Sequence, residues 1–521
     1  MSLVHLYRIC RLILFWSAFL TTFISYCKDV PASESVHLSI EPGFEGQYKK
    51  GGTVPVKVIL ENKAGETVNG EIKVLGGKIE YTFPVRLPPY SRKMEWISVH
   101  LEDISPFILF YSDKGIYLRK EVPLRHSIQN KGFVVYISHD HGRLHSLKKV
   151  IGESYQLFRV GPYDLWDFWE GYEQADFVLL DASVSEVMNG AQWVALKRYV
   201  LAGGILYVAG GTNHDFYTYT PLKELLQPPL RTDEQGNLLH KVKGVPFWSE
   251  KRVGMGHMFL LSFDSADEDF HPWMKRQNEI IVRHAQERDS SRLDILSRIP
   301  VNSWSKESNS ILLNLIKWNM GYLLLLIPLG FLGILGKRKF FWIGFAILLL
   351  AGSFSSLGML NGKNRLKGTT LITIYHGEEE SLLQSRLSVL PVRGKKVYAK
   401  FDPKQILSFD SAMLGYKSFA WDRFEKLGPV LDVNLRAQHG KIKGIIKNLS
   451  EYPIENPSIL VDGLFSPLQP IKGGEEVSIE IPDEDLSQRI KILGHWKRPI
   501  LKLKESNLSL QEETTIILYH L

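Results

Sequence analysis

The stretch FVVYISHDHGRLHSL, residues 133–147, concentrates side chains that could do acid–base or metal chemistry. An apolar run leads into a cluster of one serine, three histidines and one aspartate: Ser138, His139, Asp140, His141 and His145. Histidines four residues apart share one face of a helix and can chelate a metal ion. The stretch lacks the HExxH pattern, however, and Asp140 is equally well placed to cap a helix N-terminus. We favour the capped helix, and keep His139, His141 and His145 as the alternative metal ligands.

The elements around this stretch place its residues at one edge of a predicted sheet. Residues 131–265 alternate continuous apolar strands, among them KGFVVYIS, ADFVLLDAS and ILYVAGG, with amphipathic helices. This alternation predicts a flavodoxin-like α/β domain with a parallel sheet covered on both faces. In such sheets ligands bind beyond the carboxyl ends of the strands.

The residues expected at those strand ends are small, polar or acidic. The predicted binding residues are Ser138, Asp181, Gly210, Gly211, Thr212 and Asn213. The alternative is an enzyme, and its candidate catalytic residues are His139, Asp140, His214 and Asp215, with His141 as a further member. Thr212 is a poor nucleophile without a strong base, and the segment lacks a G-x-S-x-G elbow. A tight turn at Gly210 and Gly211 explains the glycines more simply.

An aromatic stripe, YDLWDFWEGYEQ, occupies residues 163–174. It places Trp166, Trp169 and Tyr172 at helical spacing. A platform for stacking sugars is one interpretation, but packing of these rings against the sheet is the more usual use of such a stripe.

Two β-rich regions flank the α/β region. Residues 33–130 show short alternating strands with Gly and Pro turns, including a hairpin over 107–124, and predict an Ig-like β-sandwich. Residues 361–521 return to β and predict a C-terminal sandwich. The segment 440–463 weakly echoes 55–77, which is consistent with two sandwiches of one type.

Three apolar segments set the predicted topology. Residues 1–32 have the layout of a signal peptide or N-terminal anchor. The segments 318–336 and 340–360 are uncharged and long enough to cross a bilayer, which predicts a transmembrane hairpin after a helical connector over 266–317. With Arg8 and Arg11 held inside, the chain is expected to be a multi-pass cell-membrane protein whose two large domains are extracytoplasmic.

Composition limits the chemistry. The 521 residues carry a formal net charge of +7 without a basic stripe, so we expect no nucleic-acid partner. The two cysteines, Cys10 and Cys27, both lie in the first apolar segment, which excludes thiolate metal sites and cysteine nucleophiles from the rest of the chain. No cofactor is expected.

The order of strands and helices ending in GMGHMFLLSFD resembles the class I glutamine amidotransferase-like fold. The whole arrangement resembles bacterial envelope proteins of uncharacterised function, in which a β-sandwich, an amidotransferase-like domain, a transmembrane hairpin and a β region follow one another. The specific match lies in residues 313–344. The resemblance implies a nucleophilic cysteine at the elbow after ILYVAGG, where this chain has Gly210, Gly211 and Thr212, so it implies the fold without glutaminase chemistry.

These observations favour a non-enzymatic, membrane-anchored protein that binds envelope components. Its predicted partners are the lipid bilayer and membrane or envelope proteins. The sandwich edges and the strand-end surface are the expected contact faces. The alternative is a cell-envelope hydrolase or metal-dependent enzyme that uses the strand-end His and Asp cluster.

Overall fold

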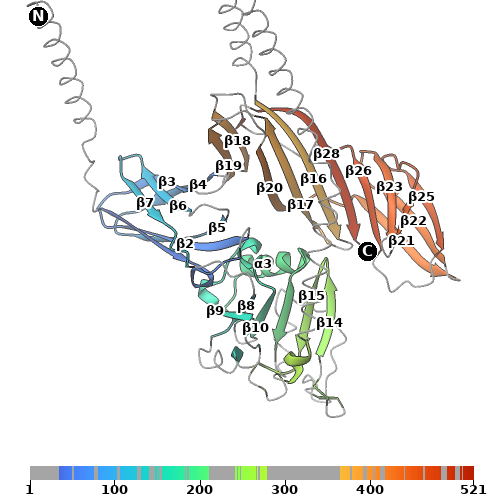
Figure 1. Ribbon diagram of the computed structural model, residues 1–521, viewed down its shortest axis with the longest axis horizontal. Helices are drawn as coiled ribbons and strands as arrows, with labels where there is room; N and C mark the ends of the chain where they lie inside the picture. Colours follow the sequence, from blue (N-terminus) through green and yellow to red (C-terminus); the bar gives the residue numbers. More distant parts are fainter. Residues whose placement is uncertain are drawn as a thin grey trace, which may run out of the picture.

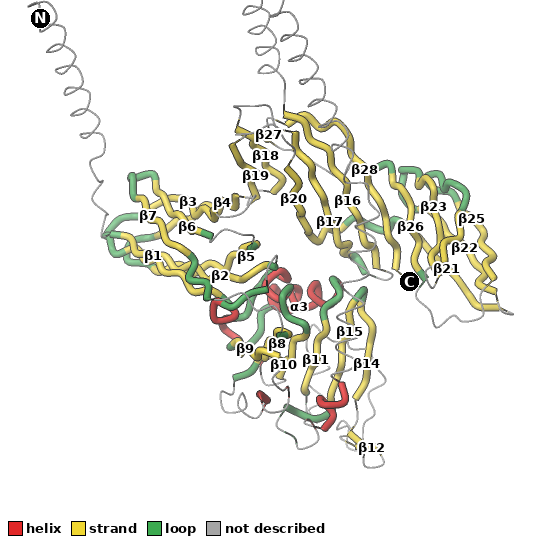
Figure 2. Tube along the Cα trace, viewed as in Figure 1, coloured by secondary structure: helices red, strands yellow, loops and turns green. Residues whose placement is uncertain are grey.

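The computed structural model describes residues 35–277 and 364–520, apart from short gaps and the segment 211–240. Strands dominate these residues, as the yellow trace in Figure 2 shows. They form two β-sandwiches and a central, mainly parallel sheet (Figure 1).

The first sandwich packs a three-stranded sheet, in the order β1-β2-β5, against strands in the order β4-β3-β6-β7. All its pairs are antiparallel. Apolar side chains from both sheets, such as Val56 and Phe110, meet in one core. The strands are β1 (Val36–Pro42), β2 (Thr53–Asn62), β3 (Val68–Leu75), β4 (Glu80–Leu87), β5 (Arg92–His100), β6 (Phe107–Ser112) and β7 (Tyr117–Glu121).

The central sheet has the order β14-β15-β11-β10-β8-β9, in which only the edge strand β14 runs antiparallel. Its inner strands are buried and mainly apolar, as expected of strands covered on both faces. Its strands are β8 (Gly132–Ile137), β9 (Tyr155–Val160), β10 (Phe177–Asp181), β11 (Ile205–Ala209), β14 (Trp248–Val253) and β15 (Gly256–Leu261). A small ladder joins β12 (Lys241–Val242) to β13 (Val245–Pro246).

Helix α3 (Gly190–Leu201) packs on one face of this sheet and has a defined start and end. Asn189 and Gln192 form a capping box, in which each side chain accepts a hydrogen bond from the other residue's backbone N–H, at 3.0 and 2.9 Å. Gly203, with φ of 104°, follows the helix in a conformation that favours glycine.

The rest of that face is covered by turns and by the first sandwich. The aromatic stripe forms two short 3-10 turns, η2 (Pro162–Asp164) and η3 (Trp169–Tyr172), instead of a regular helix. Trp166 and Tyr172 are buried, so the core-packing interpretation of the stripe is confirmed. Phe44, from η1 (Phe44–Gly46) of the sandwich, places its ring 5.5 Å from Phe133 of β8. The sandwich and the central sheet therefore share one core.

The second sandwich repeats the topology of the first. Its three-stranded sheet has the order β21-β22-β25, and it faces strands in the order β24-β23-β26-β28. The strands are β21 (Leu431–Gln438), β22 (Lys441–Asn448), β23 (Ile454–Val461), β24 (Leu464–Pro467), β25 (Glu476–Pro482), β26 (Lys491–Trp496) and β28 (Leu508–His520).

Additional strands extend both sandwiches. β16 (Asn364–Tyr375) runs parallel to β28 and is followed across the sheet by β17 (Glu380–Leu390) and β20 (Lys417–Lys426). β19 (Gln405–Asp410) pairs with β4 of the first sandwich, and β18 (Lys396–Asp402) and β27 (Glu505–Ser506) continue that sheet. The C-terminal strands thus join the N-terminal sandwich directly (Figure 1).

The predicted fold class is wrong as stated. The described chain is mainly β-sheet, and the helix-covered, flavodoxin-like or amidotransferase-like domain is not found in it. The physical reason is that turns and the first sandwich take the place of helices on one face of the central sheet.

The predicted multi-pass membrane location is also contradicted. Within the described ranges, no helix combines the length and the apolar character that crossing a bilayer requires. The predicted spans, 318–336 and 340–360, and the N-terminal segment 1–32 lie outside the described residues, as does most of the predicted helical connector over 266–317.

Candidate functional site

The carboxyl ends of β8 and β10 bring two of the predicted binding residues together. Ser138 directly follows β8, Asp181 is the last residue of β10, and both are buried. The Ser138 hydroxyl donates to Asp181 Oδ2 at 3.2 Å. Because β8 and β10 are neighbouring parallel strands, residues at their ends must lie close together.

Two residues that the sequence had not singled out complete this cluster. The Tyr136 hydroxyl lies 3.3 Å from the same Asp181 oxygen and 3.1 Å from Ser265 Oγ. Tyr136, on β8, and Ser265, just beyond β15, are both buried. A tyrosine within an apolar strand was the one available signal, because a buried phenol needs a hydrogen-bonding partner.

The geometry of this cluster suits structure more than catalysis. Asp181 is 3% exposed and accepts hydrogen bonds from hydroxyl groups of its own chain. A buried carboxylate with such partners ties strand ends together, since unmade hydrogen bonds in a core are costly. The backbone N–H of Gly210, the third predicted binding residue, donates to the Leu261 carbonyl at 3.2 Å. This hydrogen bond joins the carboxyl ends of β11 and β15.

Of the alternative catalytic and metal-binding residues, the structure describes only His139. His139 is exposed, with its ring 6.4 Å from that of Tyr163, and its carbonyl accepts from Arg159 Nη2 at 3.0 Å. The other residues of these predictions lie outside the described residues: Asp140, His141, His145, Gly211, Thr212, Asn213, His214 and Asp215. Across the described ranges, no three His, Cys, Asp or Glu side chains are grouped to hold a metal ion.

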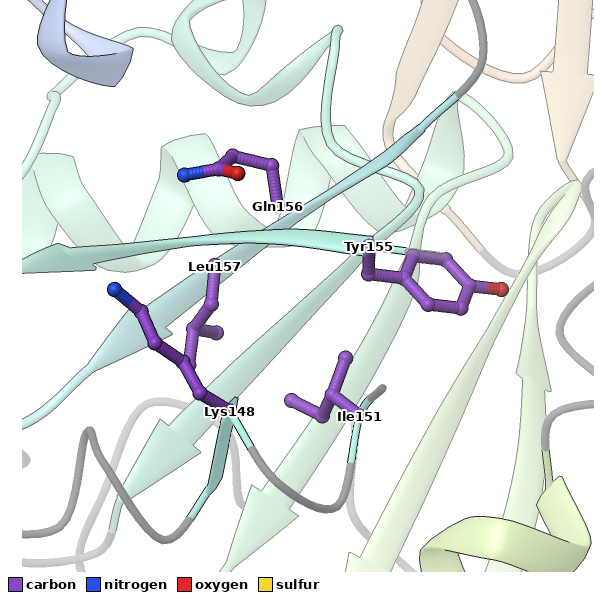
Figure 3. Close-up of a pocket in the computed structure, with 5 residues that line it drawn as sticks. All are labelled: Lys148, Ile151, Tyr155, Gln156 and Leu157. Atoms are coloured by element: carbon purple, nitrogen blue, oxygen red, sulfur yellow. The ribbon is translucent and has the colours of Figure 1, made fainter. Parts of the chain in front are cut away.

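A cavity of about 180 Å³ lies beside edge strand β9 (Figure 3). Its lining residues are Lys148, Ile151, Tyr155, Gln156 and Leu157. Burial, together with the negative charge of Asp176, raises the pKa of Tyr155 to about 12, which keeps its hydroxyl neutral. The volume is below the several hundred Å³ typical of pockets for small ligands.

An exposed aromatic surface lies on the first sandwich, on the outer side of β3, β6 and β7. We call it the tyrosine face. Its residues are Glu71, Lys73, Phe107, Leu109, Tyr111, Tyr117 and Arg119. Side chains alternate along β6, so Ile108 and Phe110 fill the core while Leu109 and Tyr111 point outward.

Tyr111 and Tyr117 are directly opposite each other across β6 and β7, and are 36% and 58% exposed. The Lys73 ammonium lies 4.9 Å from the centre of the Tyr111 ring, and the Arg119 guanidinium lies 4.2 Å from that of Phe107. Such cation–π contacts hold aromatic rings in place at a surface.

Glu71 orients the Tyr111 ring from the neighbouring strand. The Tyr111 hydroxyl donates to Glu71 Oε2 at 2.5 Å. Partial burial, and then this hydrogen bond, raise the pKa of Tyr111 above its ordinary value, so the phenol stays a neutral donor. The tyrosine face is thus a pre-ordered aromatic surface with charges of both signs.

Comparisons with known proteins cover the first sandwich best. Residues 35–124 match a family model described as a domain of unknown function, DUF8726. No curated protein matches the chain. Among solved structures, a calcium-binding mutant of Bacteroides uniformis beta-glucuronidase 2 is 10% identical with a TM-score of 0.14, and the match covers 92% of this chain and 61% of that chain. These values do not establish a shared fold.

Proposed function

We propose that this chain is a non-enzymatic protein that binds protein partners through the tyrosine face of its first sandwich. The observation that carries the proposal is the exposed cross-strand pair of Tyr111 and Tyr117. Tyrosine is enriched at protein interfaces, because a large rigid ring buries much area for little lost conformational entropy.

The charges around the rings favour a protein partner over a partner that carries charge of a single sign. Glu71 and Lys73 lie on β3, and Arg119 lies on β7 in the same row as Lys73, so the tyrosine face presents charges of both signs around its aromatic rings. Aromatic and arginine side chains together are the usual composition of interface hot spots. The match of residues 35–124 to a family model is consistent with this sandwich being a separately used module.

The test places a photo-crosslinking phenylalanine analogue at Tyr117 of the full chain. Cross-linking is carried out in cells of the native source, and the products are identified by mass spectrometry. The matched control carries the same analogue at Tyr163, which is 79% exposed but lies on the central sheet's side of the molecule. We expect a discrete protein adduct from position 117 that position 163 does not form. The same products from both positions, or none from position 117, would overturn the proposal.

A further inference from the structure

Strand β7 forms the edge of the first sandwich beside the tyrosine face, and the second sandwich shows what such an edge can carry. The two sandwiches share one strand order, in which β4-β3-β6-β7 corresponds to β24-β23-β26-β28. β7 therefore has the position of β28. β28 pairs with β26 on one side and with β16 on the other, whereas β7 pairs with β6 alone among the described strands (Figure 1).

The strand added to β28 runs parallel to it. Residues 370–375 of β16 lie beside residues 515–520, which are the part of β28 that also pairs with β26. At the opposite end of the first sandwich's sheet, β19 is added to β4 in the same manner, although antiparallel. The chain thus extends its sandwich sheets by strand addition, and β7 is an edge at which the described residues add no strand.

The backbone of β7 presents hydrogen-bonding groups at this edge. The N–H of Ser112 donates to the Ile116 carbonyl at 3.0 Å, and that of Val122 donates to the Pro106 carbonyl at 2.9 Å. In an antiparallel ladder, residues bonded to the neighbouring strand alternate with residues whose N–H and C=O point away from it. The register of β6 and β7 therefore directs outward the backbone groups of three residues: Tyr117, Arg119 and Glu121.

The exposed side chains of β7 indicate the charge of a strand that would fit there. Arg119 lies on the tyrosine face, and Lys120 lies on the other face of β7, where its ammonium donates to the Leu38 carbonyl of β1 at 3.4 Å. Within the described ranges, neither cation is paired with an acidic side chain. Lysine on an edge strand disfavours pairing with an apolar strand, whereas opposite charges on adjacent strands stabilise pairing. The edge therefore favours an acidic strand.

We propose that the partner of the tyrosine face binds by adding an extended, acidic segment of its own chain to β7 as a parallel strand. The outward N–H and C=O groups of β7 supply main-chain hydrogen bonds, which is how strand addition gives affinity in other complexes. Alternate side chains of the segment lie beside Tyr117 and Arg119 on the tyrosine face, and the others lie beside Lys120. This inference rests on the proposed function, because it gives the form and charge of what the tyrosine face recognises.

The first experiment determines the form and direction of the bound segment in the full chain. The photo-crosslinking phenylalanine analogue is placed in turn at Tyr117, Arg119 and Glu121. Cross-linking is carried out in cells of the native source, and the partner residue in each adduct is identified by mass spectrometry. A parallel strand should give adducts about two residues apart, in rising order along the partner, in a segment that contains Asp or Glu.

Three results of this mapping would overturn strand addition while leaving binding at the tyrosine face standing. The first is adducts about three or four residues apart, as on one face of a helix. The second is adducts in falling order or scattered over the partner, and the third is a segment without acidic residues. No protein adduct from position 117 would overturn the proposed function and this inference together.

The second experiment removes one outward N–H from β7. Arg119→Pro and its matched control Arg119→Ala both lack the guanidinium, but only the proline also lacks the backbone donor. An edge strand accepts proline where the N–H points away from the sheet. With the analogue at position 117, we expect at least about fivefold less adduct from Arg119→Pro than from Arg119→Ala, because the added strand loses a hydrogen bond and meets the proline ring.

A second pair of variants, Glu121→Pro and Glu121→Ala, repeats the comparison at the next outward residue. Denaturant unfolding of each chain shows whether the first sandwich is folded, and the Glu121 pair decides if Arg119→Pro is not. The adduct mapping depends on neither proline variant. Equal adduct yields from folded proline and alanine variants would overturn strand addition and leave the proposed function standing.

Discussion

Asn62 and Asn448 make the same hydrogen bonds at the same corner of the two sandwiches. Each is the last residue of the second strand of its sandwich and is buried. Each donates from Nδ2 to the carbonyl four residues on, to Glu66 at 2.8 Å and to Tyr452 at 2.9 Å. Each also accepts, on Oδ1, the backbone N–H two residues on. With the shared strand order, this identifies an internal repeat.

The repeated corner predicts equal consequences of mutation in the two sandwiches. Asn62→Ala and Asn448→Ala each remove bonds to buried carbonyls, so each should destabilise its own sandwich by about 2 kcal/mol. Denaturant unfolding with hydrogen exchange on β2 or β22 would locate the loss. Asn434→Ala, at an exposed position on β21, is the control and should change little. A loss confined to one sandwich would contradict the repeat.

The cluster around Asp181 predicts a structural outcome. Asp181→Ala removes the acceptor of the Tyr136 and Ser138 hydroxyls and should cost about 2–4 kcal/mol, whereas Ser138→Ala should cost about 1 kcal/mol. Thermal unfolding of the full chain measures both. An Asp181→Ala chain of unchanged stability that no longer bound its partner would show instead that the strand ends are the binding site.

Two glycines near α3 should respond oppositely to alanine. A Cβ at Gly256 would overlap with the backbone carbonyls of Val200 and Gly204, so Gly256→Ala should cost about 1–3 kcal/mol. A Cβ at Gly190, the first residue of α3, meets nothing, and Gly190→Ala should be neutral or stabilising by up to about 1 kcal/mol. Equal denaturation midpoints for the two variants would show that α3 is not held against β15 as described.

The ion pair between Arg198 of α3 and Glu380 of β17 predicts a loss of stability in acid. The hydrogen bonds from Arg198 hold the pKa of Glu380 below its ordinary value of 4.5. The stability from this pair is therefore present above about pH 4.5, and is lost as the pH falls through the lowered pKa. Urea unfolding at about pH 6 and about pH 3.5 should show this loss for the wild type, and less of it for Glu380→Gln. An equal loss in both chains would assign the acid sensitivity elsewhere.

Local sequence pattern predicted the strands well and their distant pairings poorly. The apolar runs KGFVVYIS, ADFVLLDAS and ILYVAGG are the strands β8, β10 and β11, and the echo between 55–77 and 440–463 reflects two sandwiches of one topology. The pairings of β19 with β4 and of β16 with β28 join segments far apart in the chain, and no local periodicity encodes them.

At the candidate sites, too, the sequence predicted local features and missed contacts between distant segments. Ser138 and Asp181 could be brought together from the sequence because both end predicted parallel strands. Tyr136 and Ser265 could not, since their contact depends on side-chain packing across the sheet. The tyrosine face depends on the register of β6 against β7, which the sequence of the hairpin alone does not determine. The predicted fold class was wrong because turns and the first sandwich, instead of helices, cover one face of the central sheet. The predicted membrane location is contradicted because the described ranges hold no helix that is long and apolar enough to cross a bilayer.

The affinity of the chain for its protein partner, measured by titration calorimetry after cross-linking has identified that partner, tests the central claim most directly. Removing the exposed rings with Tyr111→Ala and Tyr117→Ala together should weaken binding by at least about tenfold, because hot-spot aromatics carry much of an interface's energy. Tyr163→Ala should leave the affinity within about twofold. Equal affinities for the double variant and the wild type would contradict binding through the tyrosine face.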